Sequence, residues 1–428
     1  MMQRSPQLKP FRQPERDEAI RPKTLIIGTC VVCAVILIMV PRPPAARPVE
    51  AEHKADTAAD SDSVQGGGVR RRYHEPLNSR ILPHTIPSAV ATPSDKPDPG
   101  PKALANELIV KLKPDAAAID DIATSVDAKV TGSMDKFHAY RLQFTNAPAT
   151  TAAREQLAAN PEVESLDSNY PIVRPPAGDE ISSTSESQTR LTVKPGDSGG
   201  KLVVGLIDTA VQIKASGLDE SFFLSPLSVA GESSTDAASL AHGTSMAETI
   251  LQGLSAAETG NIATSVRIFP IDVYGQSETT TTYQVAEGIV KAIEGGATII
   301  NLSLGTDGDS SLLKQVIEDA HAQGIVFLGA AGNEAVTTAT YPAAYSEVVA
   351  VTATDNQGNL ASYANYGDFV DIAAPGTVIV NYNGQSYLVT GTSASTALVT
   401  GAAAGLSEVT GTSGARLEAT VRKGLSLQ

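Results

Sequence analysis

The sequence predicts an α/β protein: a doubly wound, mostly parallel sheet, preceded by a smaller ferredoxin-like α+β unit. Beyond residue 200, short apolar runs typical of buried strands alternate with helical segments. Between residues 104 and 173, the strand and helix patterns follow the order β-α-β-β-α-β, which is that of a ferredoxin-like fold. An uncharged apolar run at 24–40 adds a predicted transmembrane helix in front of both units.

The composition excludes several classes of protein. A length of 428 residues allows two or three domains, and a hydrophobic fraction of 42% is typical of a globular chain. The net charge of -15 argues against nucleic-acid binding, because phosphate contacts need a basic face. Both cysteines, Cys30 and Cys33, lie within the apolar run. The rest of the chain therefore has no thiol for a disulfide, a cysteine zinc site or a cysteine nucleophile.

The N-terminal region predicts a single-pass membrane anchor. Residues 1–23 form a basic tail that we expect in the cytoplasm, and residues 24–40 are long enough to cross a hydrocarbon core of about 30 Å. This orientation places the rest of the chain on the extracytoplasmic side. The alternative is secretion after removal of a signal peptide, because small residues follow the run at 43–46.

Two segments are predicted to be linkers. Residues 41–103 are rich in Pro, Ala, Ser and Asp, lack apolar periodicity and are expected to be disordered. Residues 174–200 form a second polar linker, rich in Pro, Gly and Ser.

The small unit spans residues 104–173. It contains neither a cluster of titratable residues nor a Gly-rich loop, so no chemistry of its own is expected. The predicted order is strand 106–114, helix 116–126, strands 129–137 and 139–144, helix 149–163 and an extended segment at 163–173.

The large domain spans residues 201–428. Parallel sheets bind ligands at the carboxyl ends of their strands, so polar residues at those ends are the candidates for chemistry. The predicted strands are 201–208, 267–274, 297–305, 324–333 and 347–355, and the predicted helices are 285–296 and 310–324.

Four polar residues stand out in the large domain. Asp208 ends the first predicted strand, His242 begins a helix after a loop, and Asn333 closes another strand. Ser393 begins a helix of small residues, where free N–H groups and the helix dipole favour an oxyanion. Taken alone, each residue is better explained as a turn former, a cap or a buried polar residue. The order Asp, His, Ser, however, is one of the few known orders of a catalytic triad.

With these motifs, residues 201–428 resemble the catalytic domain of the subtilisin-like serine peptidases. Residues 104–173 are similar to the propeptide of that family, which assists folding and inhibits the enzyme. The matching segments of the large domain are VGLIDTAV, HGTSMAETI, IINLSLG, LGAAGNE, YANYGDFVDIAAPG and GTSASTALVTG.

The resemblance implies a serine endopeptidase that cleaves polypeptides through an acyl-enzyme and is made as a self-inhibited precursor. Ser393 would attack the peptide bond, His242 would shuttle the proton and Asp208 would orient His242. Asn333, together with the Ser393 N–H, would bind the oxyanion. Residues lining the substrate groove would be Ser303, Leu304 and Gly305.

The implied partners are polypeptide substrates, the chain's own propeptide-like unit and the membrane through residues 24–40, and no cofactor is expected. Structural calcium is common in the family, but the acidic loop residues here have no calcium-loop spacing. These residues are Asp219, Glu220, Glu232 and Asp236.

Two alternatives remain open. The first is an inert or weakly active subtilase-fold binding protein whose propeptide-like unit stays docked. The second is a sedolisin-like Ser-Glu-Asp peptidase, suggested by Glu248 and the GTSAS motif, although this leaves the HGT motif at His242 unexplained.

The end of the small unit predicts how the precursor is processed. Its last segment, near Asn169 to Val173, is expected to lie in the active-site groove as an added strand. Self-cleavage would then fall within residues 172–200 and release the large domain from the anchor.

Overall fold

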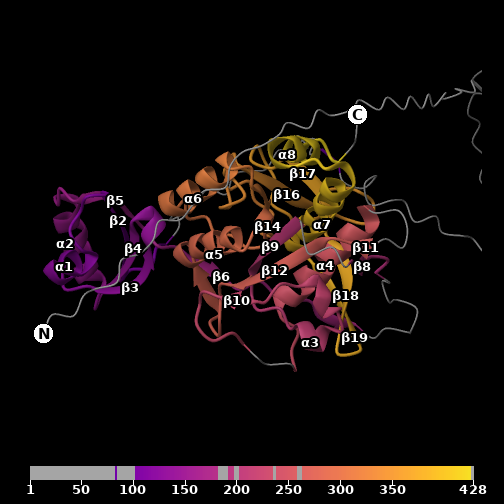
Figure 1. Cartoon of the computed structure of the whole chain (residues 1–428), viewed down its shortest axis with the longest axis horizontal. Helices are drawn as coiled ribbons and strands as arrows, with labels where there is room; N and C mark the ends of the chain where they lie inside the picture. The colour runs from indigo at the N-terminus through magenta and orange to yellow at the C-terminus, as the bar shows by residue number, and fades with distance from the viewer. Residues whose placement is uncertain are drawn as a thin grey trace, which may run out of the picture. The chain divides into compact units, whose positions relative to one another are not determined.

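The computed structural model describes residues 82–83, 102–181, 191–196, 202–234, 238–257 and 263–425 (Figure 1). The predicted basic tail at 1–23, the anchor at 24–40 and most of the linker at 41–103 lie outside these ranges. Within the described part of the chain, no helix combines the length and the hydropathy needed to span a bilayer.

The large domain is built on one eight-stranded sheet, and this confirms the predicted doubly wound α/β class. All neighbouring strands are parallel except for the first pair, which is antiparallel. In spatial order the strands are β1 (Leu82–Pro83), β17 (Ile372–Pro375), β16 (Val348–Thr354), β15 (Val326–Ala330), β14 (Ala297–Leu302), β9 (Leu202–Asp208), β12 (Val266–Asp272) and β10 (Leu227–Ser228). Strand β1 lies in the segment that the sequence predicts as linker.

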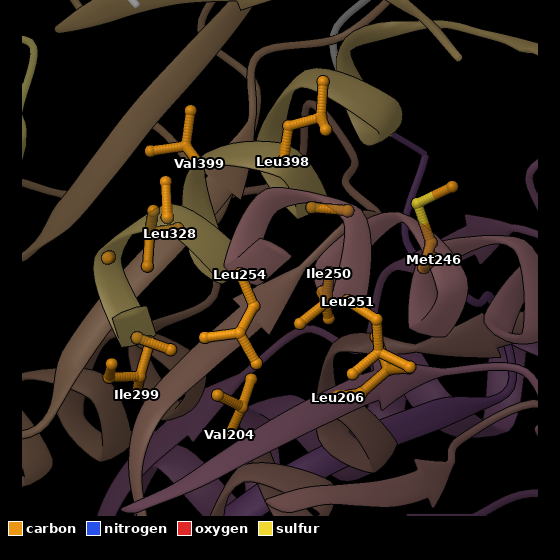
Figure 2. Close-up of a cluster of buried hydrophobic side chains, with 14 of the residues drawn as sticks. Val204, Leu206, Met246, Ile250, Leu251, Leu254, Ile299, Leu328, Leu398 and Val399 are labelled. Carbon is orange, nitrogen blue, oxygen red and sulfur yellow. The ribbon is translucent and has the colours of Figure 1, made fainter. Parts of the chain in front are cut away.

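One face of the sheet is covered by α4 (His242–Ala257), α7 (Thr392–Thr410) and α8 (Gly414–Arg422). Figure 2 shows Val204 and Leu206 of β9 packed with Leu251 and Leu254 of α4.

Helices α4 and α7 touch backbone to backbone. A Cβ added at Gly401 of α7 would lie 1.9 Å from the carbonyl oxygen of Ile250, and one added at Gly253 of α4 would lie 2.2 Å from that of Leu398. No side chain therefore separates the two helices at these points. Their first turns carry His242 and Ser393.

The opposite face is covered by α5 (Thr282–Glu294) and α6 (Ser311–Ala322). Side chains of β9 alternate between the two cores, as the strand pleat requires: Leu206 joins the first, whereas Val203 and Ile207 join the second.

The small domain confirms the ferredoxin-like prediction. Its four strands are mutually antiparallel in the order β3-β4-β2-β5, and two helices pack on one face. Its elements are β2 (Glu107–Leu112), α1 (Ile119–Ser125), β3 (Lys129–Met134), β4 (Ala139–Gln143), α2 (Ala147–Ala158) and β5 (Val163–Asp167). The predicted strand 129–137 is too long, because a 3-10 turn (η2, Asp135–Phe137) ends it at Met134.

The other face of this small sheet contributes Ile109 and Ala139 to the core of α5 and α6. The ammonium group of Lys111 also donates to Gln315 of α6 over 3.1 Å. The two folded parts therefore share a packed interface.

Small strand pairs complete the fold. The predicted linker 174–200 is not wholly irregular, because it contains β7 and β8. These shorter elements are β6 (Pro171–Val173), β7 (Asp179–Ile181), β8 (Lys194–Pro195), α3 (Ile213–Ser216), η3 (Glu220–Phe222), β11 (Ala263–Thr264), β13 (Thr279–Thr281), β18 (Thr377–Tyr382) and β19 (Gln385–Thr390). The pairs are β6 with β13, β8 with β11, and β19 with both β18 and β7.

Candidate active site

Asp208 and His242 form a buried pair at the carboxyl end of the central strand β9. Nδ1 of His242 lies 2.8 and 2.9 Å from the two carboxylate oxygens of Asp208. His242 is 3% exposed and Asp208 is 1% exposed. The N–H of Thr209 donates to the same carboxylate over 2.7 Å. Because a carboxylate only accepts hydrogen bonds, Nδ1 is the donor in this contact, and in the neutral imidazole Nε2 then has the lone pair.

Ser393 lies in the first turn of α7 and is tied to Ser303, which follows β14. The Ser393 hydroxyl donates to the carbonyl oxygen of Ser303 over 3.2 Å, and the Ser303 hydroxyl donates back to the carbonyl oxygen of Ser393 over 3.1 Å. Among the described residues, Ser393 and His242 share no direct hydrogen bond. Such bonds are often long before a substrate binds.

Asn333 comes after β15, in an exposed loop next to α7. Its side-chain oxygen accepts from the N–H of Thr392 over 2.8 Å and from the Thr392 hydroxyl over 3.1 Å. Since a backbone N–H can bond only an oxygen here, the amide orientation is fixed and its NH₂ group faces away from Thr392.

Asn365 supports this loop and was not identified from the sequence. It is 1% exposed, accepts from the N–H groups of Glu334 and Val336 (2.9 and 3.3 Å), and donates to the carbonyl oxygen of Ala331 over 3.0 Å. Its motif, YANYGD, is part of a longer segment that resembles the family, and the sequence alone indicates no role for the asparagine.

The predicted groove residues follow β14 directly. Ser303 and Leu304 are buried and Gly305 is half-buried. The next residue, Thr306, exchanges two backbone hydrogen bonds with Tyr341 (2.9 and 2.7 Å), and these bonds hold the segment in an extended shape.

Glu248 lies in α4 and bonds away from the Asp208–His242 pair. Its carboxylate accepts from the N–H of Asn381 over 2.9 Å, from the Asn381 amide over 3.3 Å and from Gln252 over 3.4 Å. Burial raises the pKa of Glu248, although hydrogen bonds from Asn381 and Gln252 oppose the shift. Glu248 therefore anchors the β18–β19 hairpin, and this geometry gives no support to a Ser-Glu-Asp arrangement.

In the described ranges, no group of three or more His, Cys, Asp or Glu side chains is placed to hold a metal ion. Asp219 accepts from the N–H of Ser221 over 2.9 Å and so caps η3, and Asp236 lies outside the described residues.

Residues 170–181, here called the crossing segment, pass the candidate site. Strand β6 pairs antiparallel with β13, and β7 pairs antiparallel with β19, which ends just before Ser393. Between them, the carbonyl oxygen of Ala177 accepts from the hydroxyl of Ser245 in α4 over 2.7 Å. Arg174 to Ala177 line one cavity together with His242.

Comparison with known proteins identifies the large domain. The model of the Subtilase family matches residues 199–423, which are 225 of the 428 residues.

The chain belongs to the subtilase family.

A second model, the fervidolysin N-terminal prodomain, matches residues 91–169 of this subtilase. The chain is thus a subtilisin-like serine protease that carries an N-terminal prodomain, and from here on the small domain is called the prodomain.

Individual relatives agree with this assignment. A thermostable alkaline protease of Halalkalibacterium halodurans is 29% identical over 299 residues, which are 68% of this chain and 78% of that protein. The minor extracellular protease Epr of Bacillus subtilis is 31% identical over 211 residues, 49% of this chain and 32% of that protein. The crystal structure of fervidolysin from Fervidobacterium pennivorans shares the fold, with a TM-score of 0.57 and 19% identity over 77% of this chain and 57% of that one.

Proposed function

We propose that this protease hydrolyses peptide bonds with Ser393 as nucleophile, His242 as general base and acid, and Asp208 as the group that orients His242. The observation that carries the proposal is the buried contact of 2.8 Å between His242 Nδ1 and Asp208. It leaves Nε2 as the acceptor for a proton.

The reaction follows from these positions. The Ser393 hydroxyl turns from Ser303 towards His242, transfers its proton to Nε2 and attacks the carbonyl carbon of the scissile bond. His242 then gives that proton to the leaving amine, and an acyl-enzyme forms on Ser393. Water, deprotonated by His242, then attacks the carbonyl carbon of the ester. His242 returns this proton to the Ser393 oxygen as the bond to the acyl group breaks and the carboxylic acid product leaves.

We infer that Asn333 binds the oxyanion together with the N–H of Ser393. Thr392 holds the amide oxygen of Asn333, so the NH₂ group is already oriented before any substrate arrives. Donors fixed in advance need no reorganisation when negative charge develops. The extended backbone at Ser303, Leu304 and Gly305 is the proposed wall of the substrate groove.

The precursor is proposed to inhibit itself through the prodomain. Two prodomain side chains cap helices of the catalytic domain. Asp167 accepts from the Ser310 hydroxyl (2.7 Å) and the Leu312 N–H (3.0 Å) at the start of α6. Asn169 accepts from the Tyr283 N–H over 3.1 Å at the start of α5. Because the crossing segment follows Asn169 directly in the chain, these contacts position it across the candidate active site.

We propose that the enzyme acts outside the cytoplasmic membrane, as a secreted protease. Support comes from the extracellular relative Epr, whose name states its location. Membrane attachment through residues 24–40 stays a prediction for the precursor.

Labelling with a fluorophosphonate probe tests the assignment of the nucleophile. The wild-type chain should be labelled after processing, and Ser393→Ala should not. A wild-type chain that is folded and processed but unlabelled would favour the inert binding protein instead.

A further inference from the structure

We propose that the surface holding the Arg174 side chain is a substrate subsite that selects a basic residue on the N-terminal side of the scissile bond. This proposal rests on the proposed function, because it requires that polypeptides are cleaved at Ser393. The subsite is formed by Tyr274, Gly275, Ser277 and Glu278, which connect β12 to β13.

The contacts of Arg174 match the chemistry of a guanidinium group. One terminal nitrogen donates to the backbone carbonyl oxygens of Gly275, over 3.3 Å, and of Ser277. The other lies 3.7 Å from the carboxylate of Glu278, and the guanidinium carbon stands 5.8 Å from the ring centroid of Tyr274. Carbonyl oxygens, a carboxylate and an aromatic face all favour a cation.

The acceptors are held in place by the catalytic domain. Asp272, which is 3% exposed, accepts from the N–H groups of Tyr274 and Gly275, both over 2.9 Å. These bonds fix the turn that presents the two carbonyl oxygens. The second carboxylate oxygen of Asp272 is buried without a hydrogen-bond partner in the described part of the chain.

The location of the subsite connects it to the reaction. Asp272 pairs with Asp208 across β12 and β9, so the turn begins beside the strand end that holds His242. The charge of Asp208 also contributes to the raised pKa of Tyr274, after burial as the main cause, and Arg174 opposes it.

The crossing segment binds the way an extended substrate would. Strand β6 adds to β13, and the N–H of Arg174 continues the ladder by donating to the carbonyl oxygen of Glu278 over 2.8 Å. Side chains alternate along it: Ile172 is 1% exposed, Val173 is 71% exposed and Arg174 turns inward again. Because the ladder uses only backbone atoms, a substrate can form it too, and its side chain at this place would meet the same acceptors.

The test uses the full-length chain and two series of internally quenched peptides. One series carries arginine and the other citrulline, its uncharged isostere, at each of the four positions before the cleaved bond. Arg174→Ala opens the subsite, and Val173→Ala is the matched control on an exposed neighbour. In wild-type protein that has finished processing, we expect kcat/KM about tenfold higher for arginine than for citrulline at one position. While the chain is still at full length, before self-cleavage, Arg174→Ala but not Val173→Ala should raise peptide turnover.

A variant of the subsite carboxylate measures how much its charge contributes to the preference for arginine. Glu278→Gln should lower the ratio of kcat/KM for arginine peptides to kcat/KM for citrulline peptides about twofold, because an exposed carboxylate contributes little. Equal kcat/KM for arginine and citrulline at all four positions would overturn the subsite while leaving the protease assignment intact. If no chain cleaves either series, the proposed function itself fails and the subsite fails with it.

Discussion

The side-chain oxygen of Asn333 accepts two hydrogen bonds from Thr392, the residue that precedes Ser393. The proposed oxyanion donor is therefore tied to the helix turn that carries the proposed nucleophile. Any shift of that turn moves both groups together, which preserves the geometry between them.

Replacing Asn333 with alanine should remove one donor to the developing oxyanion. We expect kcat to fall by about 10²–10³ with KM little changed, the range seen when such a donor is removed from a subtilisin. Steady-state kinetics with a short peptide substrate measures this. An unchanged kcat in a folded variant would contradict the assignment.

Thr392→Val serves as a matched comparison. It removes the hydroxyl bond to Asn333 but keeps the backbone N–H bond of 2.8 Å. Its effect on kcat should be smaller than that of Asn333→Ala, because the amide remains oriented. A loss of kcat as large as that of Asn333→Ala, or larger, would mean that the Thr392 side chain supports catalysis in some way other than by orienting Asn333.

Asp208→Asn tests the orientation of His242. The amide nitrogen that replaces one carboxylate oxygen would donate to Nδ1, so the imidazole would have to carry its proton on Nε2, where it no longer accepts from Ser393. We expect kcat to fall by about 10⁴ while the fold is kept. Kinetics combined with far-ultraviolet circular dichroism checks both parts. A loss of less than tenfold would argue against His242 as the base.

Processing should depend on the chain's own nucleophile. Wild-type protein is expected to be cut within residues 172–200 and to yield a fragment near the mass of residues 201–428, whereas Ser393→Ala should stay at full length. Mass spectrometry of the two purified proteins shows the difference. Cleavage of Ser393→Ala at the same place in a purified system would rule out self-processing.

Glu248 predicts how stability changes with pH. Burial raises its pKa in the folded state, so the folded chain binds its proton more tightly than the unfolded chain does. The stability from this group is present below the unfolded pKa and is lost as pH rises through the folded pKa. Relative to the parent, Glu248→Gln should therefore gain in unfolding midpoint as pH rises from 4 to 8.

This comparison is best made in a Ser393→Ala background, which prevents self-digestion during heating. Calorimetry at four or five pH values gives the difference between the two proteins. The unfolding temperature of Glu248→Gln minus that of its parent should rise with pH. A value that stays constant or falls as pH rises would contradict the prediction.

Long and strongly patterned elements could be predicted from the sequence, and short ones could not. Strands β9, β12, β14, β15 and β16 follow from their apolar runs. Strand β10 has two residues and β17 has four, so both are too short to give a periodic signal. Helix α5 begins at Thr282, earlier than the predicted residue 285, because Thr281 caps it and Asn169 binds its first turn from the prodomain.

The same limit applies to the site. Asp208, His242, Asn333 and Ser393 lie in motifs with high specificity, so their order along the chain sufficed to select them. The supporting role of Asn365 depends on two loops that meet only in the folded chain, 31 residues apart. The contacts of Arg174 are equally non-local, because its partners lie about 100 residues further along the chain, and the sequence predicts its segment as a linker.

The backbone contact between α4 and α7 also limits how this enzyme could be engineered for heat stability. Exchanging a helical glycine for alanine ordinarily favours the helix by roughly 0.8–1 kcal/mol. At Gly401 the new methyl group would have to lie 1.9 Å from the carbonyl oxygen of Ile250, so the helices must separate. Separation would move the turn of Ser393 away from that of His242. Substitutions at Gly253 and Gly401 should therefore lower activity without raising stability, so these two positions should be left unchanged in variants designed for thermal tolerance.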